Sequence, residues 1–177
     1  MSIKIRPITV SDKDRWLELF KEYIVFYKSK LSDEQFELTW QRLNSGFNIN
    51  GLLAEVDGKV VGFTHYIFRP STWAVEDFCY LEDLYTDPTL RGKGVGHQIL
   101  DAIIERAENI GVKRIFCLTF ETKFFAKHVF AEIEGTPVEP EIYQQLLQSY
   151  DVGVAEFLDL DKVKPNTLGN TRMIKHL

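Results

Sequence analysis

The chain has 177 residues, of which 45% are hydrophobic and 27% charged, and its formal net charge is −5 at pH 7. Such a length and composition predict a single globular domain over residues 1–177 and exclude a chain that is mainly disordered. The acidic balance argues against a nucleic-acid surface, which needs a clustered basic stripe, and no apolar run approaches the ~18 residues of a membrane span.

The only cysteines are Cys79 and Cys117. Two are too few for a disulfide framework or a four-thiolate metal site, and both stand in apolar runs, so we expect buried free thiols. The histidines are scattered and show no HExxH spacing, so no metal is predicted. Because the first residues contain no apolar signal segment, we expect a cytoplasmic protein.

A short strand and two helices are expected first. Alternation of Ile with polar residues at 3–5 predicts the strand. Ser11-Asp12 offers N-capping oxygens for a helix through about Tyr27, whose apolar residues recur at helical spacing. Ser32-Asp33 begins a second helix that ends before the Asn- and Gly-rich segment 44–51.

A hairpin and a long strand follow. The apolar runs Leu52–Val56 and Val60–Phe68 flank Asp57-Gly58, a pair typical of the primed turns of two-residue hairpins. After a loop, the run Phe78–Thr86 predicts another strand.

The next elements imply a crossover. A glycine-rich turn leads into a helix that Gly111 ends as its C-terminal cap, and Lys113–Phe120 reads as a buried strand. A helix between two strands favours parallel pairing, so the fold class is a mixed α/β sheet flanked by helices. In the C-terminal part, PEIYQQLLQSYD predicts a helix and TRMIKHL a final strand.

The glycine-rich turn has features that suit an anion. It reads Arg91-Gly92-Lys93-Gly94-Val95-Gly96, so its backbone can approach a ligand closely, and Arg91 and Lys93 add positive charge. The helix that follows presents N–H groups and a partial positive charge to a phosphate. Glycines in a strand-turn-helix connection can also serve only to make the turn tight.

The spacing fits neither GxxxxGKS/T nor GxGxxG, so a P-loop is excluded. Together with the preceding YLEDLYTDP, it resembles the Q/R-x-x-G-x-G/A turn of the GCN5-related N-acetyltransferase (GNAT) superfamily. The resemblance implies acetyl-CoA as cosubstrate, with its pyrophosphate on the turn and its pantetheine arm along the strand before it. The residues implied in this binding are Leu84, Tyr85, Thr86, Arg91, Gly92, Lys93, Gly94, Val95, Gly96 and His97.

The resemblance also implies a fold and an assembly. The expected order of elements over residues 1–120 is that of the GNAT superfamily, whose mixed, mostly antiparallel sheet has splayed central strands. A cleft would lie where the strand of Leu84 diverges from the strand of Cys117 and Thr119. Members of the superfamily frequently join subunits through C-terminal strands, so a homodimer is expected.

Different parts of the chain resemble two different sub-families. LTFETKFFAKHVFAEIEG resembles short, stand-alone glutamate N-acetyltransferases, with Val129 where they usually have Gly. In contrast, WLELFKEYIVFYKS and HYIFRPSTW look more like small-amine acetyltransferases. The usual Asn and general-acid Tyr of the superfamily are replaced by Lys123 and Phe130 in one alignment.

Acetyl transfer needs a proton acceptor, because an alkylammonium with a pKa near ~10.4 is protonated at pH 7. Alternation along the strand places Tyr80, Glu82 and Leu84 on one face and Leu81, Asp83 and Tyr85 on the other. By resemblance, Glu82 is the base or amine-binding carboxylate, and Asp83 is mainly structural. The alternative for Glu82 is a structural ion pair, for instance with Arg69. The N–H of Leu84 or Tyr85 would stabilise the oxyanion.

The proton donor to the leaving thiolate stays open, because Phe130 has no hydroxyl. Substitutes are Tyr143, Tyr150, His128 and Cys117, or the thiolate leaves unassisted.

Two further residues are candidates for the amine pocket. His65 would line it, unless it is a hydrogen-bonded core histidine. Tyr27 is the other candidate, at the end of the first helix; its aromatic neighbours on that helix are more typical of core.

The sequence therefore predicts an acetyl-CoA-dependent N-acetyltransferase. It would transfer an acetyl group directly to the primary amine of a small molecule, an amino acid such as glutamate or a polyamine-like amine. No nucleic acid or membrane partner is expected. The alternatives are a non-catalytic acyl-CoA-binding regulatory or sensor module, and a nucleotide-phosphate module.

Overall fold

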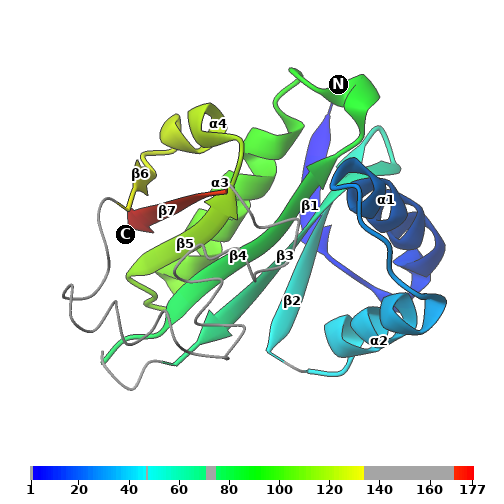
Figure 1. Ribbon diagram of the computed structural model, residues 1–177, viewed down its shortest axis with the longest axis horizontal. Coiled ribbons are helices and arrows are strands. Elements are labelled where there is room, and N and C mark those ends of the chain that lie inside the picture. Colours follow the sequence, from blue (N-terminus) through cyan, green and yellow to red (C-terminus); the bar gives the residue numbers. More distant parts are fainter. Residues whose placement is uncertain (1, 47, 71–74, 134–169) are drawn as a thin grey trace. The chain divides into compact units, whose positions relative to one another are not determined.

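The computed structural model describes residues 2–46, 48–70, 75–133 and 170–177 (Figure 1). The chain divides into two compact units, Met1–Cys117 with Lys175–Leu177, and Leu118–Ile174. The glycine-rich turn and the strand that contains Glu82 belong to the first unit.

A mixed sheet forms the frame of the first unit. Its first four strands pair antiparallel with their neighbours, and the last two pair in parallel through a helical crossover, as predicted. The prediction of a mixed α/β fold with a mostly antiparallel sheet is confirmed. In spatial order the strands are β1 (Ile3–Pro7), β2 (Ile49–Val56), β3 (Lys59–Arg69), β4 (Phe78–Thr86) and β5 (Arg114–Thr119), the last of which ends beyond the unit boundary.

Helices cover both faces of this sheet (Figure 1). Residues of β3 alternate between the faces, so Phe63 packs on Phe20 of one helix while Gly62 lies against Ile99 of another. A Cβ on Gly62 would come within 2.8 Å of the Tyr85 carbonyl oxygen, so close packing requires glycine there. The helices are α1 (Lys13–Phe26), α2 (Asp33–Asn44) and α3 (Val95–Asn109), with 3₁₀ turns η1 (Val10–Asp12) and η2 (Pro88–Leu90).

The starts of α1 and α2 differ in chemistry. At α2, the Ser32 hydroxyl accepts from the Gln35 N–H and the Gln35 side chain accepts from the Ser32 N–H, which is the predicted type of cap. At α1, Asp12 holds the N-cap position, but its carboxylate accepts from Arg6 and Thr9 and not from the helix. Asp12 thus occupies a predicted N-cap position, but its carboxylate does not form the expected capping hydrogen bond, because a guanidinium from β1 competes for it.

The hairpin between β2 and β3 has the predicted turn. Asp57 and Gly58 both have positive φ, 49° and 80°, which is the geometry of a type I′ turn. The register then pairs Val56 with Lys59 directly across the turn.

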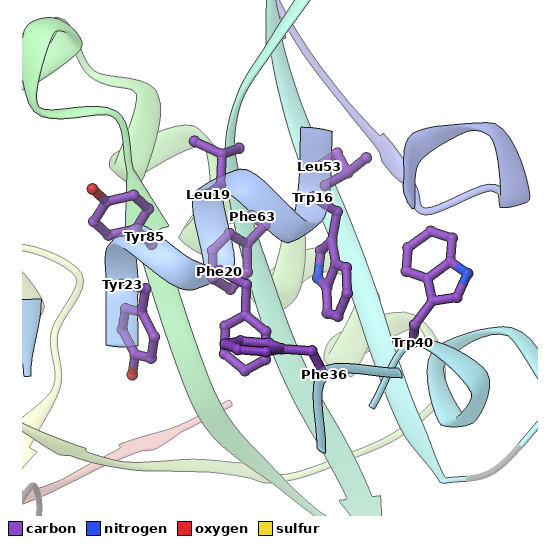
Figure 2. Close-up of a cluster of buried hydrophobic side chains, with 9 residues drawn as sticks. All are labelled: Trp16, Leu19, Phe20, Tyr23, Phe36, Trp40, Leu53, Phe63 and Tyr85. Carbon is purple, nitrogen blue, oxygen red and sulfur yellow. The ribbon is translucent and has the colours of Figure 1, made fainter. Parts of the chain in front are cut away.

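An aromatic core lies between the sheet and the first two helices, and Figure 2 shows its side chains pointing toward one another. The centre of the Trp16 ring lies 4.9 Å from the centre of the Trp40 ring and 5.3 Å from that of the Phe20 ring. Burial of such rings contributes roughly 2–3 kcal/mol each. The members are Trp16, Leu19, Phe20, Tyr23, Phe36, Trp40, Leu53, Phe63 and Tyr85.

The second unit contains α4 (Thr122–Ala126), the strand β6 (Ala131–Glu132) and the part of β7 (Thr171–His176) that ends at Ile174. The two strands pair antiparallel. The predicted final strand is therefore present. The helix predicted from PEIYQQLLQSYD lies outside the described residues. None of the helices in the described segments has the length and apolar composition that a membrane crossing requires.

Candidate active site

The glycine turn has the backbone geometry that its sequence predicts. Gly92 and Gly94 have φ of +76° and +84°, in the left-handed region, and Gly94 is the N-cap of α3. Apart from its chain neighbours, a Cβ on either residue would meet no atom of the described segments within 4 Å. Packing against these segments therefore does not require the two glycines, whereas their backbone angles do, and the open space would allow a ligand to approach.

The start of α3 offers donors to an anion. Its first helical hydrogen bond runs from the Gln98 N–H to the Gly94 carbonyl at 3.1 Å. The N–H groups of Val95 and Gly96 precede that bond and have no acceptor within the helix. No acidic residue lies in the first turn, so nothing there offsets the positive end of the helix.

Positive side chains flank these donors. Arg91 and Lys93 are exposed, and the Arg91 guanidinium lies 5.6 Å from the ring centre of Phe26 at the end of α1. An aromatic face orients a guanidinium without neutralising its charge. The turn can therefore present a fixed cation beside the amide donors.

The strand before the turn contains a β-bulge. In the register of β3 with β4, His65 lies opposite Asp83 and the next residue, Tyr66, lies opposite Leu81. The register thus skips Glu82, which is exposed. A bulge of this kind bends a strand and redirects its side chains.

The bulge changes which side chains of β4 lie on which face of the sheet. Partners across a sheet share a face, and Tyr66 and His65 lie on opposite faces of β3, so Leu81 and Asp83 lie on opposite faces too. Alternation along an unbroken strand predicts the same face for Leu81 and Asp83, and this prediction is wrong. An extra residue changes the parity of every position after it.

The last part of β4 continues past its partner on β5. The parallel ladder joins Cys79 to Ile115 and Leu81 to Cys117, whereas β4 extends to Thr86. Among the described residues, the side of Leu84–Thr86 that faces away from β3 has no partner strand. A strand edge of this kind offers backbone donors and acceptors to an added chain, so the segment is suited to the predicted pairing with an extended ligand. The splay of the two strands remains a prediction.

Three buried or half-buried side chains form a hydrogen-bonded row beneath this segment. The indole N–H of Trp16 donates to Nε2 of His65 at 2.9 Å, and Nδ1 of His65 lies 2.8 Å from Oδ2 of Asp83. His65 is 1% exposed, so it matches the alternative of a hydrogen-bonded core histidine. It has no ring nitrogen left for a substrate.

Two tyrosines lie near the row. Burial raises the pKa of Tyr23 well above its ordinary value, and the nearby Asp83 and Tyr27 add to the shift. The Tyr85 hydroxyl donates to Glu22 at 3.2 Å, and burial together with that carboxylate raises the pKa of Tyr85 to about 12. These phenols stay protonated at neutral pH and act as neutral donors.

The proton donor to a leaving thiolate remains open. Burial raises the pKa of the Cys117 thiol to about 12, above that of an ordinary thiol, so Cys117 is a poor acid for this step. Phe130 is buried and His128 is half-buried in the second unit. Tyr143 and Tyr150 lie outside the described residues.

Within the described segments, no three His, Cys, Asp or Glu side chains come together as metal ligands would. The candidate chemistry of the first unit therefore rests on backbone amides, carboxylates and neutral donors.

Residues 14–135, more than half of the chain, match the sequence profile of the Acetyltransferase (GNAT) family. The chain belongs to this GNAT family. Membership confirms the predicted superfamily and the class of enzyme, an acetyltransferase that takes its acetyl group from acetyl-CoA. The matched range includes the turn, the bulge and the row from Trp16 to Asp83.

Similar GNAT proteins include amino-acid acetyltransferases. An amino-acid acetyltransferase of Mycobacterium tuberculosis is 48% identical over 119 residues, which are 66% of this chain and 64% of that protein. The aligned part thus spans less than two thirds of that relative. The D-amino-acid N-acetyltransferase HPA3 of Saccharomyces cerevisiae is 28% identical over 134 residues, 74% of this chain and 83% of that protein.

A solved GNAT structure is also similar over nearly the whole chain. The crystal structure of Rv2747 from Mycobacterium tuberculosis in complex with CoA and NLQ has a TM-score of 0.67 and 35% sequence identity. The match covers 98% of this chain and 99% of that one. The likeness to a CoA complex supports acetyl-CoA as the cosubstrate.

The sequence missed one part of this site. Sequence reasoning gave Asp83 a mainly structural role and took the aromatic residues of the first helix, which include Trp16, as core. It did not predict that His65 forms hydrogen bonds with both Trp16 and Asp83. Trp16 and His65 are 49 residues apart in the chain. The one signal was the position of His65 within an otherwise apolar strand, which marks a buried polar group that needs partners.

Proposed function

We propose that the protein acetylates the primary amine of a free amino acid, with glutamate as the first candidate, by direct transfer from acetyl-CoA. The observation that carries the proposal is the turn before α3, where Gly94 has a φ of +84° and the amides of Val95 and Gly96 precede the first helical bond. The similarity to amino-acid acetyltransferases supports the choice of acceptor.

In this proposal, the turn holds the pyrophosphate and β4 aligns the thioester. The amine nitrogen attacks the carbonyl carbon, the C–N bond forms and the C–S bond breaks. The N–H of Leu84 or Tyr85 stabilises the oxyanion, and Glu82 accepts the amine proton directly or through one water. The electron pair of the C–S bond leaves with CoA as thiolate.

The test is thiol release. The protein is incubated with acetyl-CoA and a panel of amines, comprising L- and D-glutamate, L-glutamine, L-lysine and spermidine, and free CoA thiol is measured against a reaction without amine. We expect release with at least one amino acid and formation of its N-acetyl product. Release with spermidine alone would transfer the proposal to polyamine-like amines.

A non-catalytic sensor of acyl-CoA is the second candidate, since Phe130 lacks the hydroxyl of the usual acid. Binding of acetyl-CoA without thiol release for any amine would establish the sensor and refute the enzyme.

Glu82 provides a prediction about the chemical step. Changing Glu82→Gln removes the proton acceptor and should lower kcat roughly 100-fold, because general bases contribute about 10²–10⁴-fold. The Kd for CoA should stay within about twofold, since Glu82 precedes the turn. The matched control is Glu105→Gln, an exposed carboxylate on α3, which should change neither quantity. Equal turnover in both variants would remove Glu82 from the mechanism.

We also propose a homodimer in the cytoplasm, on the basis of the family resemblance and of the sequence features described above. Sedimentation of the purified chain tests the assembly, and a mass of one chain at micromolar concentration would refute it.

A further inference from the structure

The hydrogen bonds of His65 fix its protonation state. An indole N–H can only donate, so Nε2 of His65, at 2.9 Å from Trp16 Nε1, has to be the acceptor. The ring proton is therefore on Nδ1, which donates to Asp83 at 2.8 Å. In this arrangement the imidazole is neutral, and a second proton on Nε2 would point at the indole N–H.

A second neighbour of Asp83 is neutral as well. The Tyr23 side chain is close enough to Asp83 and Tyr27 for both to act on it electrostatically, and burial keeps Tyr23 protonated by raising its pKa. Asp83 is thus hydrogen-bonded to a neutral His65 and lies near a neutral Tyr23, while its side chain is only 16% exposed.

Other carboxylates of the first unit that lie against the sheet are paired differently. Asp12 accepts from Arg6 at 2.7 Å, and Asp87 lies 3.5 Å from Arg15. Within the described segments, no lysine or arginine lies within 4.0 Å of Asp83. A carboxylate that is largely withdrawn from water and has no counter-cation favours the approach of a cation.

Charged groups around the row fit the same conclusion. Glu22 is bonded to Tyr85, and Glu82 is the neighbour of Asp83 in the chain. The nearby cation is Arg91, which lies over Phe26 and acts on Tyr85. Apart from Arg91, these groups are acidic, and among the residues that the structure describes no ion pair supplies Asp83 with a lysine or arginine.

We propose that Trp16 and His65 are positioning residues that form a tautomer lock, which keeps Asp83 negatively charged and without a counter-cation so that it binds the ammonium group of the acceptor. An imidazolium at residue 65 would neutralise Asp83 from inside the core. Trp16 prevents this by occupying Nε2 with a donor. This inference rests on the proposed function and adds an amine-binding residue, Asp83, beside the proton acceptor Glu82.

The test uses Trp16→Phe, which keeps an aromatic ring and removes the N–H donor. Imidazole side chains change charge between pH 5 and 8, so the effect of removing the donor to Nε2 is compared at pH 6 and pH 8. Calorimetry measures the Kd of L-glutamate for the CoA-bound protein at pH 6 and pH 8. If another amine of the panel turns over faster, it replaces L-glutamate. The amine itself stays an ammonium over this range.

We expect equal affinity at both pH values for the wild-type protein. Trp16→Phe should bind roughly 10-fold more weakly at pH 6 than at pH 8, because a charge-assisted hydrogen bond is lost. Adding His65→Asn should abolish the pH effect, since the Asn amide can occupy the place of Nδ1 and donate to Asp83 but cannot titrate. Asp83→Asn should bind roughly 10-fold more weakly at both pH values.

The matched ligand is the N-acetylated form of the same amine, which lacks the ammonium. Its affinity should respond to none of these changes. A pH-independent Trp16→Phe variant, a pH effect that persists in the double variant, or equal weakening of the acetylated ligand would each overturn the lock. The absence of thiol release from the wild-type protein with every amine refutes the proposed function instead. If the wild-type protein binds no amine, both proposals fail.

A second measurement does not depend on the stability of the variants. Nitrogen-15 NMR of the wild-type protein reports the tautomer of His65 directly. We expect a neutral ring with its proton on Nδ1 from pH 6 to pH 8, and an imidazolium signal at pH 6 would overturn the proposal.

Discussion

Gly94 and Gly111 lie at the two ends of α3 with the same φ of +84°. Apart from its chain neighbours, a Cβ on either would meet no atom of the described residues within 4 Å, so the expected cost of an alanine is that of the backbone conformation. The two residues differ in what surrounds the helix end. Gly94 lies where the amides of the turn converge, whereas Gly111 caps the carbonyl end.

Gly94→Ala and Gly111→Ala should therefore each lower the free energy of unfolding by about 1–2 kcal/mol. Only Gly94→Ala should weaken CoA, by roughly 10-fold, since its methyl group stands where the pyrophosphate would approach. Urea unfolding and calorimetry measure the two quantities. If the Gly111 variant weakens CoA equally, the effect comes from the helix as a whole and the turn is not the binding site.

For single residues, the sequence predicted the features that depend on neighbours along the chain. The turn from Arg91 to Gly96 could be interpreted because backbone angles and amide positions follow from consecutive residues. The partners of His65 could not be found in this way, because Trp16 comes from a helix and Asp83 from another strand. Nothing in the sequence near His65 specifies which distant groups form hydrogen bonds with its two ring nitrogens.

Among the elements, β1, β2 and the start of α1 are joined by one arginine. Arg6 on β1 donates to Asp12 at 2.7 Å and to Glu55 on β2 at 2.7 Å. The Arg6 guanidinium, with help from Thr9, holds the pKa of Asp12 well below its usual range. A carboxylate with a depressed pKa in the folded state stabilises the fold above the unfolded pKa of ~3.9.

Asp12→Asn should lower the free energy of unfolding by about 2 kcal/mol at pH 7, because it leaves Arg6 half-buried without its main partner. The wild-type advantage should shrink as the pH falls below ~4, where the unfolded chain takes up a proton that the folded one resists. Urea unfolding between pH 7 and pH 3 measures the difference. Glu37→Gln, which removes an exposed pair with Lys13, is the control and should change nothing measurable. A constant difference at all pH values would contradict the linkage.

The bulge in β4 shows where reasoning about elements stops. The bounds of the strand, Phe78–Thr86, follow from its apolar run and were predicted. The register depends on pairing with β3, and one skipped residue at Glu82 reverses the faces of all positions beyond it. Alternation is a local pattern, so it cannot reveal that two strands differ by one residue in the paired stretch.

For the whole molecule, the prediction of buried free thiols is confirmed. Cys79 and Cys117 are free and at most 1% exposed, in the adjacent strands β4 and β5. Burial raises the pKa of both thiols to about 12. The parallel ladder that joins these strands also supports the bulge and the row beneath it, so access to the thiols reports opening of the sheet that carries the site.

Neither thiol should react with an aromatic disulfide reagent at pH 8 while the protein is folded, because the reagent attacks thiolates that it can reach. After unfolding in guanidinium chloride, two thiols per chain should react. Val75→Cys, at a position that is 98% exposed, is the positive control and should add one thiol that reacts at once. Addition of CoA should slow any residual labelling of Cys79 and Cys117, since a ligand that binds only the folded state stabilises it. Rapid labelling of the wild-type protein would show that the sheet around β4 opens readily, and the row from Trp16 to Asp83 could then not hold a fixed tautomer.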